Sequence, residues 1–284
     1  MRTIKLDVLS SPAPGAGDPH AATPARRRRL PDAALPWIGI LVVLAAFELA
    51  SRTGLVSRRT FPPVSEMVSA LGTLVVTSAF WESVWNTLQG WALGLGIAIL
   101  VSVPLGIVLG SSRPLYRALR GVVEFLRPIP SVALIPLAVL VYGTGLESKV
   151  FLAAFAAVWP LLLQTIYGVQ DFDPVATDTA RSFGFSRTQR LVRVALPSAV
   201  PYIATGVRIS SSVALILAVT AEIVIGAEGL GRDVNLARQG GAFDLMYALI
   251  IATGLLGWGL NVLFTRAERR VLHWHPSQRL ETAL

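Results

Sequence analysis

The chain has 284 residues, of which 53% are hydrophobic and 15% are charged, and its formal net charge is +8. Ordinary soluble domains carry about 25% charged residues, so this composition argues against a soluble globular protein. The chain contains no cysteine, which excludes disulfides and cysteine-based metal sites. The positive charge does not indicate nucleic-acid binding, because the arginines lie in short segments between apolar runs, as they do in membrane proteins.

Long apolar runs without any Asp, Glu, Lys or Arg recur along the chain. They cover residues 83–112, 128–146, 150–170 and 245–265. A run of about 20 such residues is long enough to cross a bilayer as a helix. The sequence therefore predicts an all-α polytopic membrane protein with about six transmembrane helices.

The amino-terminal segment, residues 1–33, is rich in Pro, Ala, Gly and Ser and has little apolar surface to bury. We therefore expect a disordered tail. The basic cluster Arg26–Arg29 precedes an apolar run that we predict as the first span, over about 34–51. A signal peptide also begins with basic residues, but no clear small-residue cleavage site follows here. The transmembrane domain is expected over 34–272.

The next segments alternate between apolar and polar character. Residues 62–82 place Met67, Ala70 and Leu74 on one helical face, which predicts an amphipathic helix at the membrane interface. The remaining predicted spans cover residues 86–111, 121–142, 147–168, 198–226 and 243–265. Glu147 and Lys149 fall at the outer turn where the span over 147–168 begins, and we expect a solvated ion pair there.

The distribution of Lys and Arg predicts the orientation. With the amino terminus inside, the tail, residues 112–127, the loop 171–197 and the carboxyl end hold most of the basic residues. Segments with such an excess face the cytoplasm. We therefore expect both termini, including a second tail over 273–284, to be cytoplasmic, together with the loop between the fourth and fifth spans.

That loop, 171–197, is the most polar long stretch in the middle of the chain. Asp173 is a candidate helix cap, and Pro174 suits the first position of a helix over 174–183. Gly184 can adopt the left-handed conformation that ends a helix.

A second helix is predicted from Ser186, where Gln189 completes a capping box. We expect this helix to end at Pro197, where the fifth span begins. Two short capped helices could dock on another protein or could merely join two spans, and the pattern alone leaves both possibilities open.

The stretches "DTARSFG" and "VALP" resemble the EAA loop of ABC importer permeases. Asp178, Thr179 and Ala180 stand where the family has Glu-Ala-Ala, so Asp replaces Glu and Thr replaces Ala. The coupling-loop residues that the resemblance implies are Asp173, Pro174, Asp178, Thr179, Ala180, Arg181, Gly184, Leu196 and Pro197. The stretches 127–152 and 221–231 add a resemblance to the nitrate, sulfonate and taurine branch of binding-protein-dependent transport permeases, over about 55–270.

This resemblance implies a type I ABC importer permease fold in the bacterial cytoplasmic (inner) membrane. It implies as partners a second copy of the chain, two ATPase subunits and an external substrate-binding protein, and as cargo a small anion such as a sulfonate, taurine or nitrate. The chain itself has no GxxxxGK[ST] phosphate loop. We therefore expect ATP and Mg²⁺ on the partner ATPase, and no cofactor or catalytic site in this chain.

Charged and hydroxyl side chains within the apolar runs are candidates for the translocation path. They are Arg208, Ser211, Ser212, Thr220, Glu222 and Glu124. Intramembrane charges usually face the bundle interior or a cavity. Interhelical pairing, or for Arg208 snorkelling towards the membrane surface, would explain the charged members equally well. His273 and His275 lack further ligands, so we expect no metal site there.

Two other functional classes deserve comparison. An ion-coupled secondary transporter should show paired halves with discontinuous helices, and a membrane enzyme should cluster His, Asp or Glu at one membrane face. Neither pattern is found in the sequence. A vitamin precursor or an aromatic acid stays open as the cargo of the same importer class, and the sequence does not distinguish a homodimeric from a heterodimeric pore.

Overall fold

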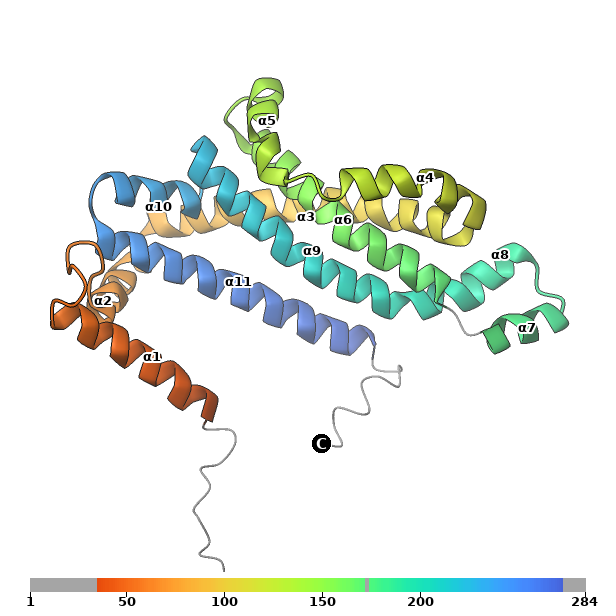
Figure 1. The fold of residues 1–284 in the computed structure, drawn as a ribbon, viewed down its shortest axis with the longest axis horizontal. Helices are drawn as coiled ribbons and strands as arrows, with labels where there is room; N and C mark the ends of the chain where they lie inside the picture. Colours follow the sequence, from red (N-terminus) through yellow and green to blue (C-terminus); the bar gives the residue numbers. More distant parts are fainter. Residues whose placement is uncertain (1–34, 172–173, 273–284) are drawn as a thin grey trace, which may run out of the picture. The chain divides into compact units, whose positions relative to one another are not determined.

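The computed structural model describes residues 35–171 and 174–272, and all regular structure in these ranges is helical (Figure 1). The elements are α1 (Leu35–Arg52), α2 (Val64–Leu74), α3 (Ser78–Ser111), α4 (Arg113–Leu126), η2 (Ser131–Leu134), α5 (Ile135–Tyr142), α6 (Leu146–Gln170), α7 (Pro174–Ser182), α8 (Arg187–Arg190), η3 (Leu191–Ala195), α9 (Leu196–Ile225), α10 (Leu230–Gln239) and α11 (Phe243–Val271). The predicted tails over 1–33 and 273–284 lie outside the described residues, as do Asp173, His273 and His275.

The chain divides into two compact units within α1, after Ala45. The first unit, in its described part, is the beginning of α1, which forms where the first span is predicted. Everything below concerns the second unit, Ala46–Leu284.

Four described helices are long and apolar enough to cross a membrane. They are α3, α6, the helix that runs from α8 through α9 (Arg187–Ile225), and α11. These match the spans predicted over 86–111, 147–168, 198–226 and 243–265. The count of six spans and the cytoplasmic position of the termini stay predictions.

The segment predicted as one span over 121–142 is not a continuous helix. α4 and the helical segment Ser131–Tyr142 meet at an angle of 80°. Pro128 and Pro130 lie in the break between them. Proline lacks a backbone N–H and disfavours helical conformation in the residue before it, so a pair of prolines this close ends α4.

Small residues set the spacing of the central helices. Gly94, Gly106 and Gly110 of α3 are buried against α6. A β-carbon at Gly94, Gly106 or Gly110 would lie 2.6–2.7 Å from the β-carbons of Ala153, Thr165 and Val169 of α6, respectively. Only glycine permits this approach, so these residues serve helix packing, as small residues commonly do in membranes.

The outer surface of the central helices is apolar. On α3, large aliphatic side chains that face outward include Leu93, Ile97, Leu100, Val101, Leu105 and Val108. Such a surface is matched by lipid rather than by water. The bilayer is therefore the natural surroundings of α3.

The helices α2 and α10 differ from the sequence predictions. The amphipathic segment predicted over 62–82 is divided between two helices. Its first part forms α2, and a turn separates α2 from residues 78–82, which are the first residues of α3. Thr77 Oγ1 caps α3 by accepting from the Phe80 amide at 3.4 Å. Leu71 and Leu74 of α2 pack against a core that includes Phe80 and Leu249. The short helix α10 was not predicted at all.

Candidate functional site

The first helix of the loop ends as the sequence predicts. α7 begins at Pro174 and ends at Ser182, and Gly184 adopts a positive φ of 77°. The Gly184 amide donates to the Arg181 carbonyl and the Phe185 amide to the Ala180 carbonyl, each at 3.0 Å. These two bonds form a Schellman motif, which satisfies carbonyls at the helix end.

The second helix begins with the predicted capping box. Ser186 Oγ accepts from the Gln189 amide at 3.2 Å, and Gln189 Oε1 accepts from the Ser186 amide at 2.8 Å. The helix does not end at Pro197, which corrects the prediction. It continues through the π-helical turn η3 into α9. A π-turn changes the local hydrogen-bond register, so a proline without an N–H can follow it in an unbroken helix.

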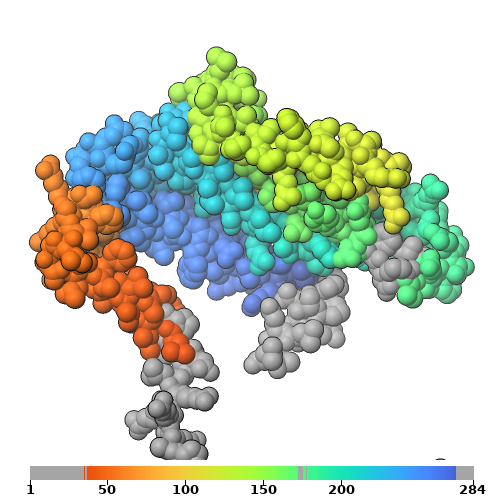
Figure 2. All heavy atoms as spheres, in the orientation of Figure 1, coloured from red at the N-terminus to blue at the C-terminus, as the bar shows by residue number. Residues whose placement is uncertain are grey.

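The root of the loop is closed by contacts between α6 and α9. Tyr202 Oη donates a hydrogen bond to Asp171 Oδ2. A β-carbon at Gly168 would lie 2.7 Å from the β-carbon of Tyr202, so α6 and α9 touch there. Beyond this root, α7 and α8 lie at one end of the second unit (Figure 1), and Figure 2 shows them, in blue-green, at its edge.

The predicted coupling residues occupy this exposed protrusion. Asp178 and Arg181 form an exposed ion pair at 3.4 Å, and Thr179 is also exposed. Ala180 is buried beneath them, Leu196 is half-buried and Pro197 is exposed. Phe183, which the sequence analysis did not single out, is 76% exposed at the end of α7. α7 therefore offers both charged and apolar side chains to a partner.

A second group of polar side chains is fully buried between α3, α6, α9 and α10. Lys149 Nζ donates to Glu222 Oε1 at 3.0 Å, to the Asn86 carbonyl at 2.8 Å and to the Glu228 carbonyl at 2.7 Å. The other carboxylate oxygen of Glu222 accepts from Thr87 Oγ1 at 3.0 Å and from the Gly231 amide at 2.9 Å. We call Thr87, Lys149, Glu222 and Gly231 the buried cluster.

Glycines make room for the buried cluster. A β-carbon at Gly90 would lie 2.4 Å from Lys149 Cε, and one at Gly229 would lie 2.1 Å from Glu222 Oε1. Gly229 also has a φ of 147°, which L-residues rarely adopt. The stretch "AEIVIGAEGLG" thus combines a buried carboxylate with the glycines that surround it.

The expectation that Lys149 forms a solvated pair with Glu147 is wrong. Lys149 is 2% exposed and bonds to Glu222, whereas Glu147 is exposed. The sequence shows both members of the actual pair, because Lys149 directly precedes the apolar run 150–170 and Glu222 lies near the end of the predicted span 198–226. Nothing in the local pattern joined the two.

The structure does not gather the six predicted path residues in one place. Glu124 is exposed and pairs with Arg120 at 2.6 Å, and Arg208 is half-buried with its Nη1 3.4 Å from Glu268 Oε2. Ser211 is buried, Ser212 is exposed, and Thr220 Oγ1 donates to the Ile216 carbonyl of its own helix. Glu222 is part of the buried cluster. Across residues 35–171 and 174–272, no three His, Cys, Asp or Glu side chains form a group that could hold a metal.

Long apolar helices joined by a capped, exposed polar loop define the chain as an α-helical, multi-pass membrane protein. Residues 102–273 match the family described as "Binding-protein-dependent transport system inner membrane component", and the chain belongs to that family. It is an ABC importer permease, a multi-pass protein of the inner membrane, as the resemblance implied.

Curated relatives extend over most of the chain. It is 32% identical to the aliphatic sulfonates transport permease protein SsuC of Escherichia coli (strain K12), over 92% of this chain and 99% of that protein. It is also 32% identical to the taurine transport system permease protein TauC of the same organism, over 84% of this chain and 89% of that protein. These relatives confirm the nitrate, sulfonate and taurine branch.

The fold also matches a solved transporter. The chain superposes with a TM-score of 0.60 on a permease from inward-facing structures of the MetNI methionine ABC transporter, at 21% identity. The match covers 68% of this chain and 96% of that one. It confirms the type I importer permease fold.

Proposed function

We propose that this permease forms the translocation path for a small anion, and that loop 171–197 is the site where a separate ATPase docks. The supporting observation is the unbroken helix from Arg187 to Ile225, which joins the loop to a membrane span. A push on the loop is thereby transmitted along one rigid element.

Four features of the loop fit this role. α7 exposes Asp178 and Arg181, and Phe183 is exposed directly after it. Gly184 fixes the end of α7, and the capping box at Ser186 fixes the start of the next helix. Tyr202 and Asp171 hold the root. A capped helix with a closed root moves as a unit, whereas a flexible linker would absorb the motion.

In the proposed cycle, ATP and Mg²⁺ bind to two ATPase subunits, and the loops of two permease copies move together as those subunits close. The pore then opens outward, where a binding protein delivers the cargo. Each step is a two-state displacement of packed helices, which is how small shifts at one site become large ones elsewhere. The permease contributes the path and the coupling, and the hydrolysis takes place on the partner.

The relatives named for aliphatic sulfonates and taurine support an anionic cargo. Nitrate belongs to the same chemical class. Four path candidates are not fully buried. Arg208 could offer an anion a positive charge and Ser212 a hydroxyl donor, whereas Thr220 Oγ1 already donates to the Ile216 carbonyl and Glu124 carries a negative charge paired with Arg120. We assign Glu222 to the buried cluster instead, because all its described contacts are within the protein.

Reconstitution tests the proposal. The permease should co-purify with an ATPase subunit, and vesicles that contain the complex and its binding protein should take up labelled sulfonate, taurine or nitrate only with ATP. Uptake by the permease alone, driven by an ion gradient, would contradict it and favour a secondary transporter. Uptake of a vitamin precursor or an aromatic acid would support the importer function and contradict the proposed cargo.

A further inference from the structure

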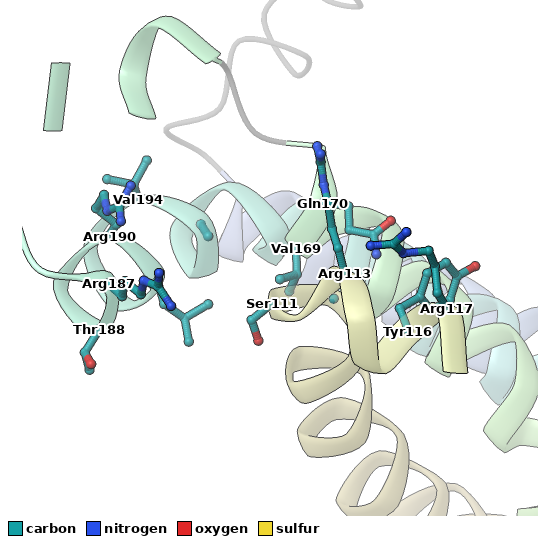
Figure 3. Close-up of a pocket in the computed structure, with 13 residues that line it drawn as sticks. Ser111, Arg113, Tyr116, Arg117, Val169, Gln170, Arg187, Thr188, Arg190 and Val194 are labelled. Carbon is teal, nitrogen blue, oxygen red and sulfur yellow. The ribbon is translucent and has the colours of Figure 1, made fainter. Parts of the chain in front are cut away.

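A cavity of about 720 Å³ lies where α3 ends, α4 begins, α6 ends and α8 begins (Figure 3). Four arginines line it: Arg113, Arg117, Arg187 and Arg190. Figure 3 shows Arg187 and Arg190 on one side and Arg113 and Arg117 on the other. Its described lining residues include no Asp or Glu. We call it the arginine cavity.

Arginines close to the cavity, but outside its lining, have partners within the protein. Arg120 pairs with Glu124, Arg181 pairs with Asp178, and the guanidinium of Arg193 lies 5.8 Å from the ring centroid of Phe185. None of these three lines the cavity. Within the described ranges, by contrast, no carboxylate pairs with any of the four arginines that do.

Arg190 carries the strongest indication of a ligand. Its Nε is buried and has no hydrogen-bond partner in the described part of the chain. Buried polar atoms in proteins are nearly always hydrogen-bonded, so this unpaired Nε shows that the described part of the chain leaves the Arg190 guanidinium incompletely satisfied beside the cavity. Guanidinium groups bind phosphate oxygens in a bidentate manner, and Tyr116, Thr188 and Gln170 add neutral groups around them.

The position of the cavity beside α4 indicates where a phosphate would come from. Leu115, Leu119, Val122 and Phe125 follow one face of α4 and are exposed, whereas Arg113 and Arg117 lie on the opposite face. A helix of this kind lies in the membrane interface, with its apolar face among the acyl chains. The arginine cavity then lies at the level of the lipid headgroups.

We propose that the arginine cavity binds the headgroup of an anionic phospholipid from the cytoplasmic leaflet. Basic pockets between membrane helices on this side are known to suit such headgroups. The lipid would bridge α4 to α8, the helix that follows α7, and would therefore stabilise the loop. The proposal depends on the proposed function in one respect only, namely that the loop faces the cytoplasm.

Lipid binding to the purified importer complex tests this assignment. The complex is placed in nanodiscs of phosphatidylcholine with increasing phosphatidylglycerol, and the phosphatidylglycerol bound per permease chain is counted by native mass spectrometry without nucleotide. Arg117→Gln/Arg190→Gln should weaken binding by about tenfold or more, because each arginine near the surface contributes to anionic-lipid attraction.

The matched control removes the same charge outside the cavity, from α4 and from η3, which directly follows α8. Arg120→Gln/Arg193→Gln should leave phosphatidylglycerol binding unchanged. Equal losses in both double variants would mean diffuse surface attraction and would overturn the proposal. If the first variant fails to fold, Arg113→Gln/Arg187→Gln, which changes two exposed residues of the same cavity, gives the same comparison.

A further experiment distinguishes binding of a lipid headgroup from binding of a free anion. Inorganic phosphate is titrated onto the complex in pure phosphatidylcholine nanodiscs. Cavity-dependent phosphate binding, without cavity-dependent phosphatidylglycerol binding, would overturn the lipid assignment. Because lipid is counted on the permease chain without ATP, the result is independent of transport, and failure of the importer proposal would show itself separately in the uptake assay.

Discussion

Lys149 Nζ lies 3.0 Å from Glu222 Oε1, although 73 residues separate the two in sequence. Both side chains are almost completely buried, at 2% and 0% exposure. Each hydrogen bond of the two charged groups described above goes to another part of the fold, so the buried cluster connects α3, α6, α9 and α10. Buried charges persist only when paired and hydrogen-bonded, and this pair meets that condition.

Breaking one half of this pair should destabilise the permease strongly. Lys149→Met leaves the Glu222 carboxylate buried without its cation, which costs about 3–5 kcal/mol. We expect a markedly lower midpoint of thermal unfolding in detergent and little protein in the membrane fraction. Glu222→Gln should behave in the same way, because it leaves the ammonium unpaired.

The exposed pair Arg120–Glu124 provides the comparison. Arg120→Met removes an ion pair of the same type, at 2.6 Å, but from side chains that are about 60% exposed. Its unfolding midpoint should be close to that of the unaltered protein, since exposed pairs contribute little. Similar midpoints for Lys149→Met and Arg120→Met would contradict the role assigned to the buried cluster.

The sequence predicts features that depend on residues close together in the chain, and it does not predict contacts between distant segments. The caps at Gly184 and Ser186 are local, and both form as predicted. The four long spans also follow from hydropathy alone. The partner of Lys149 depends on helix packing between distant segments, and the 80° bend before Ser131 depends on how two prolines are accommodated. α10 is short and polar and has no local pattern that distinguishes it from a loop.

The contact between α3 and α6 predicts a difference between two glycines of the same helix. Gly106→Ala would place a β-carbon 2.6 Å from Thr165 Cβ, so we expect a loss of about 1–3 kcal/mol from overpacking. Gly96→Ala meets no atom within 4 Å and should be neutral or slightly stabilising. Unfolding midpoints of the two variants provide the measurement. Equal destabilisation would show that these helices do not pack as described.

The turn at Gly184 predicts a coupling defect without a folding defect. Gly184→Val must hold a β-branched residue at a φ of 77°, which costs about 1–2 kcal/mol and favours unwinding of the α7 end. Space is not the limitation, because no atom lies within 4 Å of a β-carbon there. Membrane insertion should be normal, while ATP hydrolysis per transported anion rises several-fold in reconstituted vesicles.

Gly184→Asn controls for the added side chain, because asparagine tolerates the left-handed conformation. It should keep a near-normal ratio of hydrolysis to uptake. If valine and asparagine uncouple to the same degree, the conformation of Gly184 is not what matters, and if neither does, the loop is not the ATPase contact.

The capping box at Ser186 predicts a change in dynamics that is confined to the start of the helix leading into the membrane span. Ser186→Ala removes the acceptor of the Gln189 amide and should cost about 1 kcal/mol of helix stability. Because the helix continues from Arg187 to Ile225, hydrogen exchange should quicken over residues 187–196 and remain slow in the middle of α9. Ser182→Ala, on the exposed end of α7, supplies the matched serine removal and should leave that exchange unchanged. Unaltered exchange in Ser186→Ala would mean that the cap does not hold the second helix, and rigid transmission from the loop would lose its structural basis.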